Sequence, residues 1–270
     1  MSHQRRIALV TGASEGLGVE FARVFAERGH DLALVARRAD RLEALADEIA
    51  AKNAKSGKPR PIVVALDLAP ADAPGKLASA LAQAGASVEY LVNNAGYGLN
   101  GRFAELPIDD QLGMIDLNVR SLTAMARQFL PDLRAARGGM VNVASIAAFA
   151  PGPGMAVYYA SKAYVLSLSE ALAEELRADG VRVTALCPGP VVTGFQKRAG
   201  MNAEAFSAPP GVAGARETAV AAYDGLMAGR RVVTPGLVNQ ALAAGLAWIP
   251  HSISLPQLAA RQAKRLDAGK

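Results

Sequence analysis

The sequence contains a single cysteine, Cys187, in 270 residues. One cysteine cannot form an intramolecular disulfide, so nothing favours a secreted, disulfide-stabilised protein. Histidine is also scarce: His3, His30 and His251 are far apart, and no Cys/His spacing resembles a metal site. We therefore expect no metal ion in this protein.

Dense basic runs and aromatic residues are lacking as well. No basic run is longer than a pair such as Arg37-Arg38 or Arg230-Arg231, and aromatic residues make up only 5% of the sequence. Nucleic-acid interfaces usually need clustered cations, so we expect no nucleic-acid partner. The formal net charge of +5 suits an anionic cofactor, and it is equally a neutral solubility feature.

No hydrophobic run is long enough to cross a membrane. The first six residues lead into a strand-like run that is too short for a signal peptide. The longest mostly apolar stretch, residues 237–250, contains Asn239 and Gln240 and falls short of a spanning helix. The simplest interpretation is a soluble cytoplasmic protein.

What the sequence does contain is enough apolar material for one large α/β domain. Hydrophobic residues make up 51% of the chain and charged residues 20%. Such domains often exceed 200 residues without dividing.

The first 36 residues predict a strand, a glycine-rich turn, a helix and a second strand. Residues 7–10 and 32–35 are short apolar runs, as expected for strands buried on both faces. Between them, Gly12, Gly16 and Gly18 precede a helical apolar pattern that ends near Gly29. In this context glycines let the backbone approach a pyrophosphate at a helix N-terminus. The turn therefore predicts dinucleotide binding, and the alternative is a structural turn.

The end of the second strand bears on the choice of cofactor. A carboxylate there would bind the ribose 2′-hydroxyl of NAD(H), but this sequence has Ala36-Arg37-Arg38. A guanidinium favours the 2′-phosphate of NADP(H), with Arg37 the preferred partner. The alternative is a surface arginine pair at the start of the next helix. Glu15 also argues against NADP(H), because it places a negative charge in the phosphate-binding turn.

The rest of the chain continues the alternation of strands and helices. Mostly apolar runs at residues 62–66, 90–92, 141–144 and 181–186 predict strands, and residues 230–233 should form a seventh. Helical patterns cover residues 78–84, 112–133 and 215–227, and another helix follows the loop at residues 151–154. This alternation predicts a doubly wound parallel sheet, with Gly12, Asp67 and Asn93 gathered at the carboxyl edge. Within residues 112–133, Asn118 is either exposed or faces the cleft.

Tyr158 and Lys162 are four residues apart on a predicted helix, so they share one face. A nearby ammonium lowers a phenol's pKa, by one to three units if the charges are roughly 4 Å apart. Such a tyrosine can exchange a proton with a substrate oxygen. The alternative is an ordinary solvated helix face.

Over residues 6–194 the sequence resembles the classical short-chain dehydrogenase/reductase family. The resemblance rests on five motifs in order: Thr11-Gly12-(x)₃-Gly16-x-Gly18; Asn93-Asn94-Ala95-Gly96; Asn118; Ser145 with Tyr158 and Lys162; and Pro188-Gly189 followed by Thr193. It implies a single Rossmann-type domain with a seven-stranded parallel sheet of order 3-2-1-4-5-6-7 and helices on both faces. It also implies a homodimer or homotetramer formed through the helices near residues 112–133 and 157–176.

The resemblance implies hydride transfer between NADP(H) and a carbonyl or alcohol carbon. Tyr158 would be the general acid in reduction, Lys162 would lower its pKa and bind the nicotinamide ribose, and Ser145 would hydrogen-bond the substrate oxygen. Asn118 would position a water that relays protons to Lys162. The cofactor would contact Gly12, Ser14, Gly16, Leu17, Gly18, Arg37, Asp67, Leu68, Asn94, Ala95, Gly96, Tyr158, Lys162, Pro188, Gly189, Val191 and Thr193.

Further expectations concern Tyr159, Cys187 and the C-terminal part of the chain. The family motif, Tyr-x-x-x-Lys, selects Tyr158, so we interpret Tyr159 as a packing residue or as part of a substrate wall. Cys187 is expected in the core, not as a nucleophile.

Residues 190–215 would be a lid over an apolar ketone, steroid-like or 3-oxoacyl substrate, or an ordinary loop. Residues 236–270 form an extension, broken at Pro250 and Pro256, that packs on the domain or a neighbouring subunit, or lies on a membrane. The rival function is a catalytically idle NADP(H)-binding sensor or scaffold.

Overall fold

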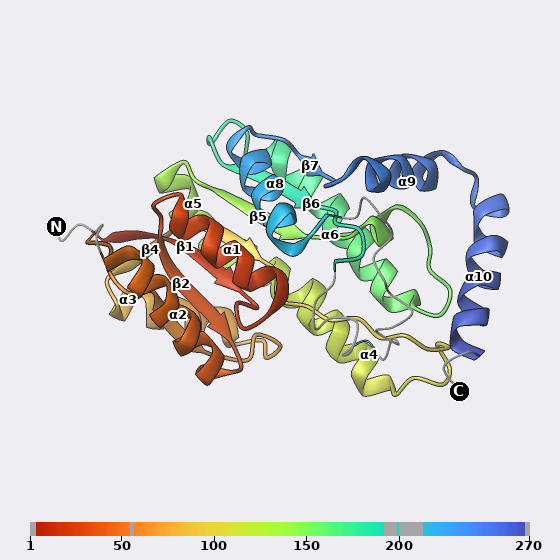
Figure 1. Cartoon of the computed structure of the whole chain (residues 1–270), viewed down its shortest axis with the longest axis horizontal. Helices are drawn as coiled ribbons and strands as arrows, with labels where there is room; N and C mark the ends of the chain where they lie inside the picture. The colour runs from red at the N-terminus through yellow and green to blue at the C-terminus, as the bar shows by residue number, and fades with distance from the viewer. Residues whose placement is uncertain (1–3, 55–56, 192–198, 200–212, 268–270) are drawn as a thin grey trace.

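Seven parallel strands form one twisted sheet with helices on both faces (Figure 1). The computed structural model describes residues 4–54, 57–191, 199 and 213–267. The spatial order is β3-β2-β1-β4-β5-β6-β7, which confirms the expected topology. The strands are β1 Arg5–Thr11, β2 Asp31–Ala36, β3 Ile62–Ala65, β4 Ala86–Asn93, β5 Gly139–Val143, β6 Arg182–Leu186 and β7 Val232–Val233.

The helices lie between and beyond these strands. They are α1 Gly16–Glu27, α2 Ala39–Asn53, α3 Ala73–Gln83, α4 Ile108–Ile115, the π-helix η2 Asp116–Ser121, α5 Leu122–Ala136, the 3₁₀ helix η3 Ile146–Phe149, α6 Ala156–Glu175, α8 Ala215–Met227, α9 Leu237–Trp248 and α10 His251–Asp267. The expected strands and the expected long helices are therefore present, with bounds that differ by a few residues.

Both faces of the sheet are buried because successive side chains of a strand point to opposite sides. In β1, Ala8 and Val10 join one apolar cluster with α1, α2 and α8. Ile7 and Leu9 join a second cluster with α3 and α5. All four side chains are at most 1% exposed, which explains why the strand is a continuous apolar run.

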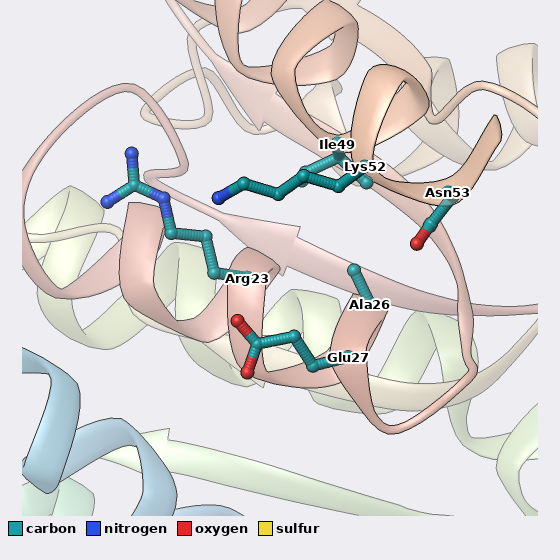
Figure 2. Close-up of a pocket in the computed structure, with 6 residues that line it drawn as sticks. All are labelled: Arg23, Ala26, Glu27, Ile49, Lys52 and Asn53. Atoms are coloured by element: carbon teal, nitrogen blue, oxygen red, sulfur yellow. The ribbon is translucent and has the colours of Figure 1, made fainter. Parts of the chain in front are cut away.

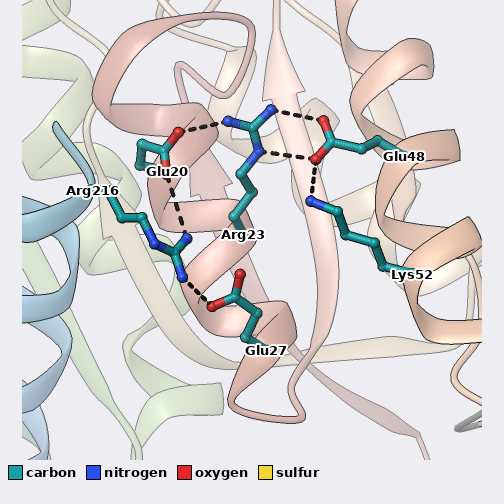
Figure 3. A network of polar contacts seen from close by, with 6 residues as sticks. All are labelled: Glu20, Arg23, Glu27, Glu48, Lys52 and Arg216. Carbon is teal, nitrogen blue, oxygen red and sulfur yellow. Dashed lines mark hydrogen bonds and ion pairs between the residues drawn. The ribbon is translucent and has the colours of Figure 1, made fainter.

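An ion-pair network joins α1, α2 and α8, which pack in the same apolar cluster on one face of the sheet (Figure 3). Arg23 of α1 donates to both carboxylate oxygens of Glu48 in α2, at 3.1 and 2.7 Å, and this pairing holds the pKa of Glu48 down at about 2. Arg216 of α8 donates to Glu27 of α1 at 2.6 Å. The network fixes the position of α1, whose first turn carries the glycines.

The C-terminal extension differs from the expectation. Figure 1 shows α9 and α10, in blue, outside the two helical layers. Pro250 separates the two helices, but Pro256 lies inside α10. The prediction that Pro256 breaks the helix is wrong, because its missing N–H removes one hydrogen bond near the start of a helix of 17 residues.

Candidate active site at the carboxyl edge of the sheet

The glycine-rich turn after β1 leaves space above the start of α1. Gly12 and Gly16 have φ of +66° and +57°, a region that side chains disfavour. A Cβ on Gly18 would lie 2.2 Å from the Gly12 carbonyl oxygen. Glu15, at the N-cap position, turns its carboxylate to Arg38 instead of capping the helix. The first N–H groups of α1 therefore face the cradle that the glycines leave, which fits a pyrophosphate.

Thr11 and Asn94 hold this turn against the end of β4. The Thr11 hydroxyl donates to Val92 O and accepts from the N–H groups of Asn94 and Ala95. The Asn94 amide donates to the carbonyls of Thr11, at 2.9 Å, and Gly12, at 3.3 Å. The Asn93-Asn94-Ala95-Gly96 motif thus positions the glycine turn, and its spacing in the sequence does not reveal this role.

The two arginines after β2 have different surroundings. Arg38 donates to the Ser14 hydroxyl at 3.0 Å and to Glu15 at 2.7 Å. Arg37 is exposed. The arginine that contacts the turn is therefore Arg38, which the sequence interpretation ranked second, while Arg37 remains open to solvent beside it.

Asp67 and Leu68 follow β3 at the same edge of the sheet. Asp67 is exposed and accepts a hydrogen bond from Ala69 N at 3.1 Å, whereas Leu68 is 4% exposed and joins the core. Gly12, Asp67 and Asn93 thus lie at the carboxyl ends of β1, β3 and β4, on one edge of the sheet, as expected.

Asn118 is buried because the helix widens around it. It lies in the π-helical turn η2 between α4 and α5 and is 1% exposed. Its Oδ1 accepts from Tyr97 N at 3.1 Å, and its Nδ2 donates to Tyr97 O and to Ser161 Oγ. Of the two alternatives left open, the exposed one is wrong. A Cβ on Gly96 would lie 2.7 Å from Asn118 Oδ1 and 3.7 Å from Lys162 Nζ, so these residues meet.

Ser145, Tyr158 and Lys162 converge at the end of β5. Ser145 caps η3 through a bond from Ala147 N, and it hydrogen-bonds Tyr158. Lys162 is 6% exposed; its Nζ donates to Val143 O at 2.8 Å and lies 5.8 Å from the centre of the Tyr158 ring. The neighbouring Tyr159 packs its ring against Gly152, where a Cβ would come within 2.3 Å. This contact supports the packing role of Tyr159, and a place in the substrate wall stays a prediction.

Burial dominates the acid–base properties of this cluster. It raises the pKa of Tyr158 to about 12, against the opposing effect of the Ser145 hydrogen bond. It lowers the pKa of Lys162 to about 8. The expected lowering of the Tyr158 pKa is not found: desolvation of the phenolate outweighs the Ser145 hydrogen bond, and Lys162 is not among the groups that shift this pKa.

The loop after β6 completes this edge. Cys187 is fully buried and its pKa is raised to about 12 by burial, which fits a core thiol and not a nucleophile. Pro188 O accepts from Ile146 N, and Val191 is partly exposed. Thr193 lies outside the described residues, as does most of the stretch expected to form a lid.

The extension contacts the site, which the sequence did not indicate. A Cβ on Gly189 would lie 2.2 Å from Asn239 Oδ1 of α9. Gln262 of α10 packs on Gly154 and hydrogen-bonds Asn100. Both contacts are long-range in the sequence, so no local pattern could have revealed them.

A small pocket elsewhere does not compete with this site. Figure 2 shows it between α1 and α2, lined by Arg23, Ala26, Glu27, Ile49, Lys52 and Asn53. Its volume of about 20 Å³ holds roughly one water molecule. It is too small for a dinucleotide.

Comparison with known proteins agrees with this geometry. The family model described as short chain dehydrogenase matches residues 6–204. A serine 3-dehydrogenase of Agrobacterium fabrum is 37% identical over 199 residues, which cover 73% of this chain and 77% of that protein.

Two solved structures are similar over nearly the whole chain. A short-chain dehydrogenase from Sphingobium yanoikuyae in complex with NADPH is 32% identical, with a TM-score of 0.75, covering 96% of this chain and 94% of the other. A short chain dehydrogenase/reductase from Burkholderia phymatum in complex with NAD is 27% identical, with a TM-score of 0.78, covering 95% and 96%. With its sheet order, glycine turn and the cluster around Tyr158, this chain belongs to the classical short-chain dehydrogenase/reductase family and is an oxidoreductase of the CH–OH/C=O class.

Proposed function

We propose that this protein transfers a hydride between NADP(H) and the carbonyl or alcohol carbon of a small substrate, with Tyr158 as general acid and base. The observation that carries the proposal is the convergence of Tyr158, Ser145 and Lys162 at the end of β5. The glycine cradle at the start of α1 lies at the same edge of the sheet. The nicotinamide ring, when bound, supplies or accepts the hydride.

Each side chain has a defined task in the reduction. With its pKa near 12, Tyr158 is protonated at neutral pH and is ready to donate a proton to a carbonyl oxygen. The Ser145 hydroxyl hydrogen-bonds the same oxygen and stabilises its developing charge. Lys162, with a pKa near 8, is mostly cationic at pH 7 and binds ribose hydroxyls. The Asn118 side chain is engaged by Tyr97 and Ser161, so its role in positioning a relay water stays a prediction.

The test is NADPH oxidation at 340 nm across a panel of carbonyl compounds, with two matched tyrosine variants. Tyr158→Phe should lower turnover by about 10² to 10⁴-fold, the usual contribution of a positioned general acid. Tyr159→Phe removes a neighbouring phenol that packs on Gly152, and it should stay within about threefold of the native protein. Unchanged turnover in Tyr158→Phe would remove the mechanism. NADPH binding without turnover of any compound would favour the idle sensor or scaffold.

Preference for NADP(H) is supported by the arginine pair after β2. Arg38 already contacts Ser14 of the turn, and the exposed Arg37 is open to the 2′-phosphate. Similar structures hold either NADPH or NAD, so binding must be measured with both. Arg37→Asp should raise the Kd of NADPH at least about tenfold, since it replaces attraction with repulsion, and leave that of NADH nearly unchanged. Equal losses would refute the assignment.

We propose an apolar ketone, steroid-like or 3-oxoacyl substrate from the apolar residues that the sequence has in the interval 190–215, most of which lies outside the described residues. Because one relative is a serine 3-dehydrogenase, the panel includes serine, assayed as an alcohol with NADP⁺. Faster turnover of serine than of every apolar compound would overturn the apolar class and leave the reductase chemistry intact.

Self-association through the helices near residues 112–133 (α4, η2 and α5) and 157–176 (α6) is supported by apolar side chains that α4 and α6 expose. Ile108, Leu112 and Ile115 of α4 are 60%, 50% and 40% exposed, and Tyr164 of α6 is 40% exposed. We propose a homodimer or homotetramer that buries this surface. A cytoplasmic location stays a prediction, and in the part of the chain that the structure describes no helix is long and apolar enough to span a bilayer.

A further inference from the structure

The C-terminal extension carries an unusual distribution of charge. Residues 232–260 contain no Asp, Glu, Lys or Arg, although a fifth of the whole chain is charged. Between Asp224 and Asp267 there is no acidic residue at all. The cations of this interval stand at its two ends: Arg230, Arg231, Arg261, Lys264 and Arg265.

Helix α9 buries the polar side chain of Asn239 and exposes large apolar side chains, unlike a surface helix with its apolar stripe turned inward. Its inward residues Asn239 and Ala243 are 2% and 6% exposed. Its outward face includes Leu237, Leu242 and Trp248, which are 82%, 50% and 87% exposed. The apolar face continues through Val238, Ile249 and Ile253, each about half exposed. We call these six residues the outer face of α9, although Ile249 and Ile253 follow that helix. Exposed apolar side chains grouped in this way mark an interaction surface.

The inner side of α9, opposite the outer face, packs on the rest of the protein. Asn239 donates to Pro235 O at 2.8 Å and packs on Gly189, while Gln240 donates to Thr234 O at 3.0 Å. Gln262 fastens α10 to Asn100. The inward side of α9 is therefore occupied by protein, and only the apolar side is available to a partner.

We infer that the outer face of α9 binds the surface of an anionic lipid bilayer. With 12 residues α9 is about 18 Å long, too short to cross a hydrocarbon core of about 30 Å, so it would lie flat at the interface. Leucine and tryptophan side chains enter the boundary between headgroups and acyl chains, while flanking cations attract anionic headgroups.

Charge favours a bilayer over a second copy of this chain. Two copies that met through this segment would bring together ten cations, five from each, and no anion from the interval between Asp224 and Asp267. Anionic headgroups would neutralise the same cations. The pairing of an uncharged apolar face with cations alone is the pattern of an amphipathic interfacial helix.

The native protein contains its own probe, because Trp248 is the only tryptophan. Its emission should shift to shorter wavelength, and acrylamide quenching should fall, when vesicles of phosphatidylcholine with phosphatidylglycerol are added. The shift should be much weaker with phosphatidylcholine alone and should decrease as salt is raised. The measurement needs neither substrate nor cofactor, so it is independent of the proposed function.

Variants that keep the probe separate the two contributions. Leu237→Ser with Leu242→Ser should abolish the shift, since both remove exposed apolar area. Arg230→Gln with Arg231→Gln should weaken vesicle binding by roughly 25-fold, at about fivefold for each cation. The matched controls, Phe103→Ser and Arg177→Gln, change residues that are equally exposed but outside the segment, and should bind as the native protein does.

Three results would overturn the inference. The first is emission that anionic vesicles leave unchanged. The second is equal binding to neutral and anionic vesicles. The third is a shift that appears without lipid and grows with protein concentration, which would assign the outer face of α9 to a second copy of the chain. Far-UV circular dichroism of every variant establishes that it is folded.

Discussion

Lys162 should make the stability of this protein rise with pH in a window where most proteins lose stability. Burial lowers its pKa from the ordinary 10.5 to about 8, so between these values the unfolded chain binds more protons than the folded one. Under that condition the free energy of unfolding increases with pH. At about 1.36 kcal/mol per pH unit the full effect is about 3 kcal/mol. The protein thus carries a cation at its site at a considerable cost in stability.

The comparison that isolates this effect is with Lys162→Met, which keeps the length of the side chain and removes the charge. The variant loses the hydrogen bond to Val143 O, a loss of about 1 kcal/mol that does not depend on pH. Tyr158 and Cys187 have raised pKa values, so their contributions fall above about pH 9 to 10. The Tyr158 contribution is common to both proteins. Cys187 interacts with Lys162, whose charge is the smallest of the causes that shift the Cys187 pKa. From pH 7 to pH 10 the native protein should gain about 2.5 kcal/mol relative to the variant.

The assay is urea unfolding at pH 7, 8, 9 and 10, followed by far-UV circular dichroism. The difference in the free energy of unfolding between the two proteins is plotted against pH. Parallel curves, within about 0.5 kcal/mol, would refute the reasoning and would mean that Lys162 is hydrated or paired in solution. A difference that changes in the opposite direction would mean that its pKa is raised.

Three further predictions follow from individual contacts. Gly18→Ala should lower NADPH affinity at least about tenfold because its Cβ would lie 2.2 Å from Gly12 O. The control Gly75→Ala, whose Cβ would meet no described atom within 4 Å, should leave the affinity unchanged. Affinity is measured by fluorescence titration, and equal values for the two variants would contradict binding of the pyrophosphate at the glycine turn. Asn142→Ala should cost about 2 to 5 kcal/mol in urea unfolding because it removes two buried hydrogen bonds and leaves the Asn93 amide without this acceptor, although Ser169 keeps its bond to Val165 O. A loss under about 1 kcal/mol would contradict this. Leu112→Glu should shift the sedimentation coefficient towards the monomer, and an unchanged oligomer would place the interface elsewhere.

The elements that the sequence predicted well are those with a local cause. The buried strands are continuous apolar runs because both faces of the sheet are covered, and the glycine turn is visible because only glycine tolerates its backbone. Arg38 shows where local patterns stop. Arg37 and Arg38 are chemically identical, and only the path of the chain after β2 decides that Arg38 reaches Ser14.

The site chemistry was harder to predict because it depends on burial. The spacing of Tyr158 and Lys162 gave their common helix face correctly, but it contained no information on desolvation, which reverses the expected direction of the Tyr158 pKa. Asn118 was ambiguous for a related reason. Its inward direction comes from the π-helical turn, and an apolar pattern drawn on a regular helix cannot represent the extra residue in that turn.

Helices α9 and α10 contact Gly189 and Gly154, so the C-terminal extension can affect which substrates the protein prefers. The family match ends at residue 204, so α9, which packs on Gly189 of the candidate site, lies in the part of the chain that the match does not include. We therefore expect hydride chemistry and substrate specificity to diverge separately, since the catalytic cluster lies before that boundary. A chimera that joins residues 1–235 to the C-terminal segment of a relative should keep its hydride chemistry and acquire a different set of preferred substrates.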